Sequence, residues 1–214
     1  MKKTSIVLLL LLAFSISGFA RAPFTEFKVG YLNPKAAEGG YIFGFNVGRM
    51  IDESLSWSLE LNYFQKGYRK QTTIDRSQTG NNETIETVQL EMDFKTRIVP
   101  VFVKLNYEHP LGYRSPLYAR ASAGLGWELL WNSEDNYVDK IHQTRFFNGF
   151  GWQLSGGVGF EISSSANFFA DIFYNDAIVK RNQTKNELGL PTWDQLNISG
   201  LGVRLGVSIV GFGW

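Results

Sequence analysis

The stretch LSWSLELNY, from Leu55 to Tyr63, alternates apolar and polar residues without a break. Its odd positions hold leucine, tryptophan and tyrosine, and its even positions hold serine, glutamate and asparagine. Successive side chains of a β-strand point to opposite faces, so this period of two predicts a strand with one apolar face. We therefore expect Leu59 to lie on the apolar face of this strand and Glu60 on the polar one.

The same alternation recurs along the chain, most clearly from Leu117 to Trp131 and from Phe150 to Ile162. In the second of these, the face opposite the apolar one is nearly all glycine and polar groups. Weaker versions run over Phe24 to Leu32, Gly40 to Ile51, Val88 to Tyr107, Phe168 to Asp176 and Leu196 to Val210. No stretch between them shows the 3.6-residue period of an amphipathic helix. The sequence thus predicts an all-β protein of eight strands.

The connections between these strands alternate in length. Three are short, namely Asp52 to Ser54, His109 to Pro116 and Ser163 to Asn167. Three are long and polar, namely Arg69 to Thr87, Asn132 to Asn148 and Ala177 to Gln195, and only the first connection, near Pro34 to Gly39, breaks the trend. This sorting is typical of an antiparallel transmembrane up-and-down β-barrel whose turns and termini are periplasmic. A secreted β-sandwich has no reason to sort its connections in this way.

The start of the chain carries Lys2 and Lys3, an apolar stretch from Ser5 to Ile16, and small residues up to Ala22. These are the three parts of a secretory signal peptide. The apolar stretch is shorter than the roughly 20 residues of a membrane-spanning helix. We expect residues 1–22 to be a cleaved signal peptide, with cleavage after Ala20 as the second choice. Residues 23–214 are then an integral barrel in the outer membrane of a Gram-negative bacterium.

The segment from Val88 to Tyr107 changes the parity of its apolar residues. They are even-numbered up to Ile98 and odd-numbered from Val101 onward. One extra residue in a β-bulge moves all later side chains to the other face, and proline is tolerated at bulges. We expect a bulge near Val99 and Pro100, since otherwise Lys104 would face lipid.

If the apolar faces contact lipid, the polar faces line the lumen. The expected lumen residues are six acids and six bases: Lys28, Glu60, Glu91, Asp93, Lys95, Arg97, Lys104, Arg120, Glu128, Glu161, Asp171 and Arg204. An eight-stranded barrel is only wide enough inside to be filled by side chains. Because isolated buried charges are costly, we expect these groups to form a paired charge network.

Composition excludes several classes of site. The chain has no cysteine, so disulfides, thiolate metal sites and a lipoprotein anchor are excluded. Its 21 basic and 20 acidic residues give no electrostatic case for nucleic acid. We expect no cofactor and no metal, since no metal cluster or phosphate-binding glycine loop is visible.

Several segments resemble the outer-membrane β-barrel (porin-like) family common in Bacteroidetes. They are the LNYFQKG stretch from Leu61 to Gly67, IVPVFVK from Ile98 to Lys104, LYARASAG from Leu117 to Gly124, and GLGVRLG from Gly200 to Gly206. The resemblance covers nearly the whole mature chain and implies a fold and a location rather than an activity. The terminal Phe212 and Trp214 are similar to the signal read by the barrel-assembly machinery, although Ile209 stands where that signal usually has glycine.

Three functional hypotheses follow. The first is a structural or surface-interaction barrel whose outer loops contact an extracellular or envelope partner, with Trp193 as a possible binding anchor. The second is a narrow porin-like channel for small solutes. The third is a lipid-modifying or proteolytic enzyme, for which His142 is the histidine to weigh, since His109 falls in a predicted periplasmic turn. We expect no catalysis.

Overall fold

The computed structural model describes residues 22–79, 83–113, 115–137, 140–182 and 193–211. Within these ranges it describes the backbone alone at residues 70–79, 83–92, 141, 182 and 193. None of the described residues belongs to a helix that is long and apolar enough to cross a membrane.

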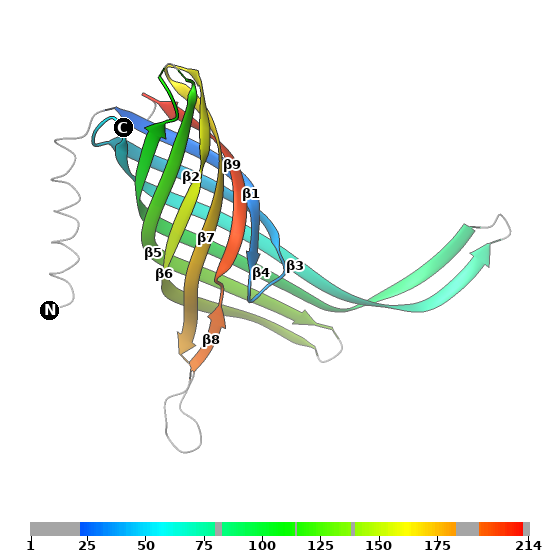
Figure 1. Ribbon diagram of the computed structural model, residues 1–214. Coiled ribbons are helices and arrows are strands. Elements are labelled where there is room, and N and C mark those ends of the chain that lie inside the picture. Colours follow the sequence, from blue (N-terminus) through cyan, green and yellow to red (C-terminus); the bar gives the residue numbers. More distant parts are fainter. Residues whose placement is uncertain (1–21, 80–82, 114, 138–139, 183–192, 212–214) are drawn as a thin grey trace.

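The described chain folds into strands that wind around a single axis (Figure 1). Their bounds are β1 Pro23–Pro34, β2 Gly40–Met50, β3 Leu55–Thr79, β4 Glu83–Pro110, β5 Leu117–Asn136, β6 Ile141–Ser163, β7 Ala166–Asn182, β8 Trp193–Asn197 and β9 Gly200–Val210. Every pairing is antiparallel, neighbours in sequence pair in order from β1 to β7, and β9 pairs with both β1 and β7. The sheet therefore closes, and the expectation of an eight-stranded antiparallel barrel is confirmed.

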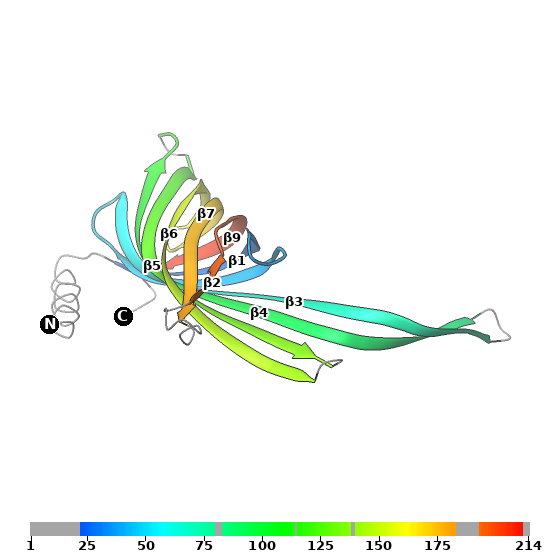
Figure 2. The same cartoon turned by 90° about the horizontal axis from the view of Figure 1, so that it is seen from below.

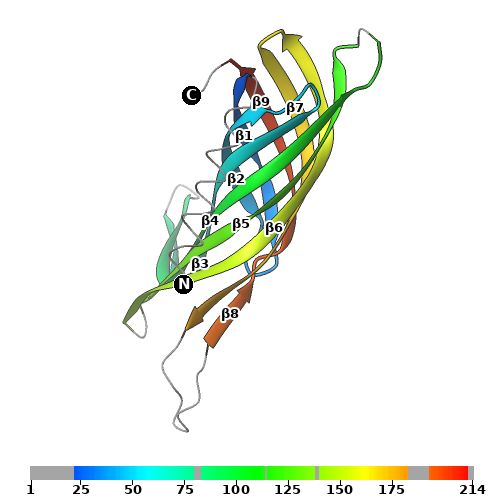
Figure 3. The same ribbon diagram turned by 90° about the vertical axis from the view of Figure 1, so that its left-hand side faces the viewer.

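The eighth expected strand is divided in two. β8 pairs with β7 alone, Ile198 and Ser199 interrupt the strand, and β9 then continues along β7 and β1. The hydroxyl of Ser199 donates to the carboxylate of Asp176 at 2.6 Å, and Ser199 Oγ accepts from the backbone N–H of Ala177 at 3.2 Å. These bonds hold the interruption against β7. Figure 3 shows β7 and β8 projecting together past one end of the barrel.

The two ends of the barrel differ. Short turns, such as residues 51–54 and 164–165, lie at one end with the described termini, and we name this the turn end. Long hairpins leave the other, the hairpin end, where β3 and β4 continue as a two-stranded arm far from the barrel (Figures 1 and 2). The stretch Arg69 to Thr87, expected as a loop, lies mostly in this arm, which is paired as far as Thr79 and Glu83. Its many threonines favour extended backbone, which explains why strands replace the expected loop.

Side-chain facing follows the parity of the sequence. Leu59 and Leu154 are 45% and 51% exposed on the outer surface, whereas Glu60 and Gln153 are 0% and 1% exposed. The apolar side of these strands is thus the outside of the barrel, and the polar side is the lumen.

The expected bulge at Pro100 is absent, and that prediction is wrong. Leu61 pairs with Val101 and Phe64 with Ile98 in one register, and the pairing of β4 with β5 is unbroken there. The register shifts lie in the arm instead, at Lys70/Gln71 and Thr73/Asp75. Parity changes because the inner face itself becomes apolar toward the hairpin end, where Ile98 is buried in the lumen.

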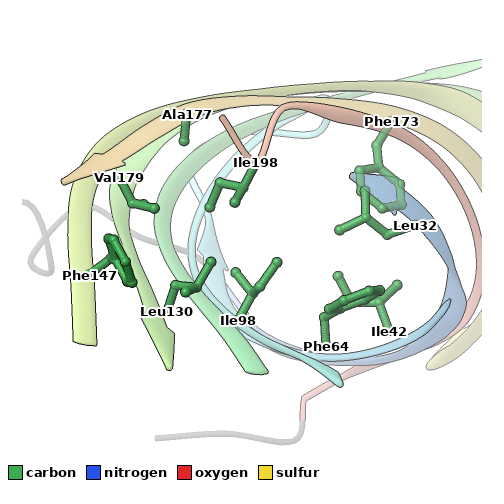
Figure 4. Packing of buried hydrophobic residues seen from close by; sticks show 10 residues of the cluster. All are labelled: Leu32, Ile42, Phe64, Ile98, Leu130, Phe147, Phe173, Ala177, Val179 and Ile198. Atoms are coloured by element: carbon green, nitrogen blue, oxygen red, sulfur yellow. The ribbon is translucent and has the colours of Figure 1, made fainter. Parts of the chain in front are cut away.

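That apolar part of the lumen is a cluster of buried side chains pointing toward the barrel axis (Figure 4). We name it the apolar layer, and its members are Leu32, Ile42, Phe64, Ile98, Leu130, Phe147, Phe173, Ala177, Val179 and Ile198. It crosses the bore close to the hairpin end.

Candidate functional site

Between the apolar layer and the turn end, the lumen is charged. Alternation along the strands brings charged side chains from six strands into the interior, and all are at most 7% exposed. We name them the charged layer, and its members are Glu26, Lys28, Glu60, Lys104, Arg120, Asp171 and Arg204.

Glu60 is the hub of this layer. Its carboxylate accepts from Lys28 Nζ at 2.6 Å, from Lys104 Nζ at 3.2 Å and from Arg204 Nη1 at 3.0 Å. Asn62 Nδ2 donates to the same carboxylate at 2.9 Å. One acid thus links three cations from β1, β4 and β9, and so ties distant strands together across the bore.

The remaining members extend the network. Glu26 pairs with Lys28 and with Arg120, both at 2.8 Å. Asp171 lies 3.3 Å from Arg120 Nε and 3.4 Å from Arg204 Nε. The Arg120 guanidinium also lies 3.7 Å from the centre of the Phe169 ring, a cation–π contact. Each charge in the layer has an opposite neighbour, which is the condition under which buried charges are tolerated.

Glu128 is buried apart from the charged layer. Its Oε1 accepts from Asn175 Nδ2 at 2.6 Å, while its Oε2 has no hydrogen-bond partner among the described residues. Hydrogen bonding to a neutral amide, rather than pairing with a cation, distinguishes this carboxyl from Glu60.

The twelve expected lumen residues divide into three groups. Seven lie inside the barrel: Lys28, Glu60, Lys104, Arg120, Glu128, Asp171 and Arg204. The side chain of Glu91 lies outside the described residues. Four lie elsewhere: Asp93, Lys95, Arg97 and Glu161.

Placing those four in the lumen was wrong, for two reasons. Without a bulge, Asp93, Lys95 and Arg97 share the outward parity of Val101 and Val103 on β4, and Asp93 pairs on the outside with the exposed Arg69 at 3.1 Å. Glu161 has inward parity but lies in the last turn-end residues of β6, where it is exposed.

Glu26 was missed, although it shares the even parity of Lys28 on β1. That parity was the signal that could have found it. The expected anchor Trp193 and the terminal Phe212 and Trp214 lie outside the residues whose side chains are described.

The mouth of the barrel at the hairpin end is hollow. A cavity of about 600 Å³, which we name the mouth cavity, is lined by Asn132, Gln143, Arg145, Phe147, Arg181, Asp194, Gln195 and Leu196. A smaller hollow of about 250 Å³ shares Asn132 with it and includes Lys66, which pairs with Glu38 at 3.5 Å. Phe147 and Val179 of the apolar layer lie on the same two strands as Arg145 and Arg181, two residues closer to the barrel, so the layer borders the cavity on its turn-end side.

The two histidines lie outside these cavities. His109 stacks on Tyr107 with ring centres 6.3 Å apart, near the turn end. His142 Nδ1 lies 2.9 Å from Asp135 Oδ1 on the exposed β5–β6 hairpin. The described residues contain no group of histidines and acids placed to hold a metal ion.

The match to a protein family decides the identity of this barrel. The family model described as "Outer membrane protein beta-barrel domain" matches residues 6–208. The chain belongs to this family. It is therefore an integral protein of the outer membrane, and by the rule for such barrels its turn end is periplasmic and its hairpin end extracellular.

Solved structures agree on the fold. The chain is similar to a major outer membrane protein from Thermus thermophilus, with 12% identity, a TM-score of 0.52 and coverage of 89% of this chain and 100% of the other. It is similar to OprG from Pseudomonas aeruginosa, with 12% identity, a TM-score of 0.52 and coverage of 90% and 97%. It is also similar to the Escherichia coli outer membrane protein W, with 12% identity, a TM-score of 0.51 and coverage of 89% and 97%. At this identity the likeness shows the fold alone. A search of curated proteins found no match.

Proposed function

We propose that this barrel is a non-conducting surface protein that acts through its extracellular hairpins, without catalysis. The filled lumen carries the proposal. The charged layer and the apolar layer each cross the bore, and the largest buried side chains of both, including Phe64, Phe173 and Lys104, have almost no exposed surface. A solute channel would need an open polar path through both layers.

The extracellular hairpins offer the surface that the filled lumen does not. β2 pairs with β3 only up to Phe64, and β5 pairs with β4 only from Met92 toward the turn end. Beyond these residues, one edge of each arm strand has no partner among the described strands. Free strand edges present unpaired N–H and C=O groups that can add a strand from another chain. The partner is thus an extracellular or envelope protein that docks on the arm.

Site-specific photo-cross-linking tests this role. A photoreactive residue at Tyr68, which is exposed where the arm leaves the barrel, should yield a protein adduct in intact cells. The same residue at Leu59, on the lipid-facing wall, is the matched control in the same strand and should yield none. Adducts at neither position, or equal adducts at both, would contradict the proposal.

We also propose export by the cleaved signal peptide at 1–22 and insertion by the barrel-assembly machinery through Phe212 and Trp214. The enzyme that removes signal peptides requires a small neutral residue before the cut, so Ala22→Asp should block processing at that site. A shift in gel mobility from mature to precursor chain is the measurement. Normal processing in the variant would exclude Ala22.

A further inference from the structure

We infer that the mouth cavity binds a sugar that carries a carboxylate. The cavity opens on the extracellular side, and its volume of about 600 Å³ lies within the range of small-molecule sites. This inference goes beyond the proposed function, because it concerns a small ligand in this cavity rather than a protein on the arm.

The wall of the cavity carries charged side chains of both signs. Arg181 of β7 lines the cavity opposite Asp194 of β8, its partner in the strand pairing, which lines the same wall. Arg145 of β6 lies on the same wall, bonded to Glu134 at 3.1 Å, and its side chain keeps 37% of its surface exposed. The cavity lining thus holds two guanidinium groups and one carboxylate, an excess of positive charge that favours an anion, and the planar pair of N–H groups of a guanidinium matches a carboxylate.

Uncharged polar and apolar side chains also line the cavity. The amides of Asn132 and Gln143 line the cavity. The Gln143 oxygen accepts from Arg145 at 2.9 Å and the Asn132 oxygen from Thr96 at 3.4 Å, and the amide N–H groups can donate to sugar hydroxyls. Phe147 and Leu196 line it with apolar surface against which a sugar ring can pack. A bare inorganic anion would use the arginines and the amide N–H groups and leave this apolar surface without contacts.

The position of the cavity limits which ligands can reach it. The cavity lies between β5, β6, β7 and β8 at the hairpin end, on the extracellular side of the apolar layer, so a ligand approaches it from outside the cell. A headgroup in the surrounding membrane faces the outer wall and cannot reach it. A free saccharide, or the exposed sugar chain of a lipopolysaccharide that folds over the rim, has the required chemistry.

Isothermal titration of the detergent-solubilised barrel with glucuronate tests the inference. Wild-type protein should bind glucuronate and should bind glucose at least about tenfold more weakly, because the charge-assisted bonds are lost. Arg181→Gln should weaken glucuronate binding by at least about tenfold. Lys180→Gln is the matched control, since Lys180 is the adjacent cation on the exposed outer face of the same strand and should bind as wild type does.

Repeating the titration with lipopolysaccharide that contains acidic core sugars separates the two sources. If the sugar is taken up free, glucuronate alone binds, and if it is lipid-borne, lipopolysaccharide binds with the same dependence on Arg181. Equal effects of Arg181→Gln and Lys180→Gln, equal binding of glucose and glucuronate, or no binding of either acidic probe would overturn the inference. Cross-linking at Tyr68 does not depend on Arg181. The proposed protein-binding function of the arm can therefore fail while the proposed sugar binding in the mouth cavity holds.

Discussion

Glu60 accepts hydrogen bonds from two lysines, one arginine and one asparagine while fully buried, so one carboxylate balances much of the lumen charge. Glu60→Gln leaves three cations without their shared anion. We expect this to lower the free energy of unfolding by about 3–5 kcal/mol, as removal of one partner from a buried ion pair does. Urea unfolding of the micelle-embedded barrel, followed by tryptophan fluorescence, measures the loss.

Glu161→Gln is the matched control for that experiment. Glu161 is exposed near the turn end, so removing its charge should change the free energy of unfolding by no more than about 0.5 kcal/mol. Equal losses in the two variants would show that Glu60 is not the hub of the charged layer.

For Glu128, we expect the substitution by glutamine to have the opposite effect on the free energy of unfolding. Its only hydrogen-bond donor among the described residues is the Asn175 amide, and the side-chain oxygen of a glutamine can accept the same hydrogen bond. An ionised carboxylate without a cation is costly to bury, so Glu128→Gln should leave the barrel as stable as wild type or more stable. The same urea titration measures it. A loss as large as that of Glu60→Gln would mean that a cation contacts Glu128.

At the scale of the element, β3 allows a test of the two faces of the wall. Leu59 points outward between Val47 and Val103, so Leu59→Arg should cost about 2–4 kcal/mol if the site lies near the bilayer midplane. Leu59→Ala should cost less, because lipid fills the space that a protein core could not. Refolding into lipid vesicles at a series of denaturant concentrations gives both values. An arginine variant as stable as the alanine variant would contradict lipid contact.

Spin labels placed singly from Ser56 to Asn62 extend that test to the whole strand. Accessibility to oxygen dissolved in lipid should be high at odd positions and low at even ones, following the alternating exposure of β3. A flat profile or the reverse parity would exclude this facing.

The strands differ in how clearly their sequence encodes them. Alternation predicted the strands because lipid makes one face uniformly apolar, as from Leu55 to Tyr63. The alternation failed near Pro100, because the sequence alone does not distinguish an apolar residue that faces the lumen, such as Ile98, from one that faces lipid. It also missed the arm, since a two-stranded hairpin that leaves the barrel is no longer tied to one apolar and one polar face.

The candidate site was predictable in part for a related reason. Parity placed Glu60 and Arg204 on the inner face, but the register of the closed sheet decides that they meet across 144 residues of sequence. No local sequence pattern indicates that these two residues are in contact. The mouth cavity depends on the same closure, because its arginines, Arg145 and Arg181, come from neighbouring strands whose pairing follows from the complete barrel.

At the scale of the whole molecule, two layers of different chemistry close the bore. We therefore expect the protein to conduct no ions across a planar lipid bilayer. The charged layer blocks apolar solutes and the apolar layer blocks ions, so wild-type protein should show no stepwise conductance. Ile98→Ala combined with Leu130→Ala thins only the apolar layer and leaves the ion pairs around Glu60 intact. This variant should lose stability, since large apolar side chains are truncated, but it should still conduct no ions. Conductance steps in wild-type protein would contradict the closed lumen. Steps in the double variant alone would show that the apolar layer is the sole seal and that water and ions already pass the charged network.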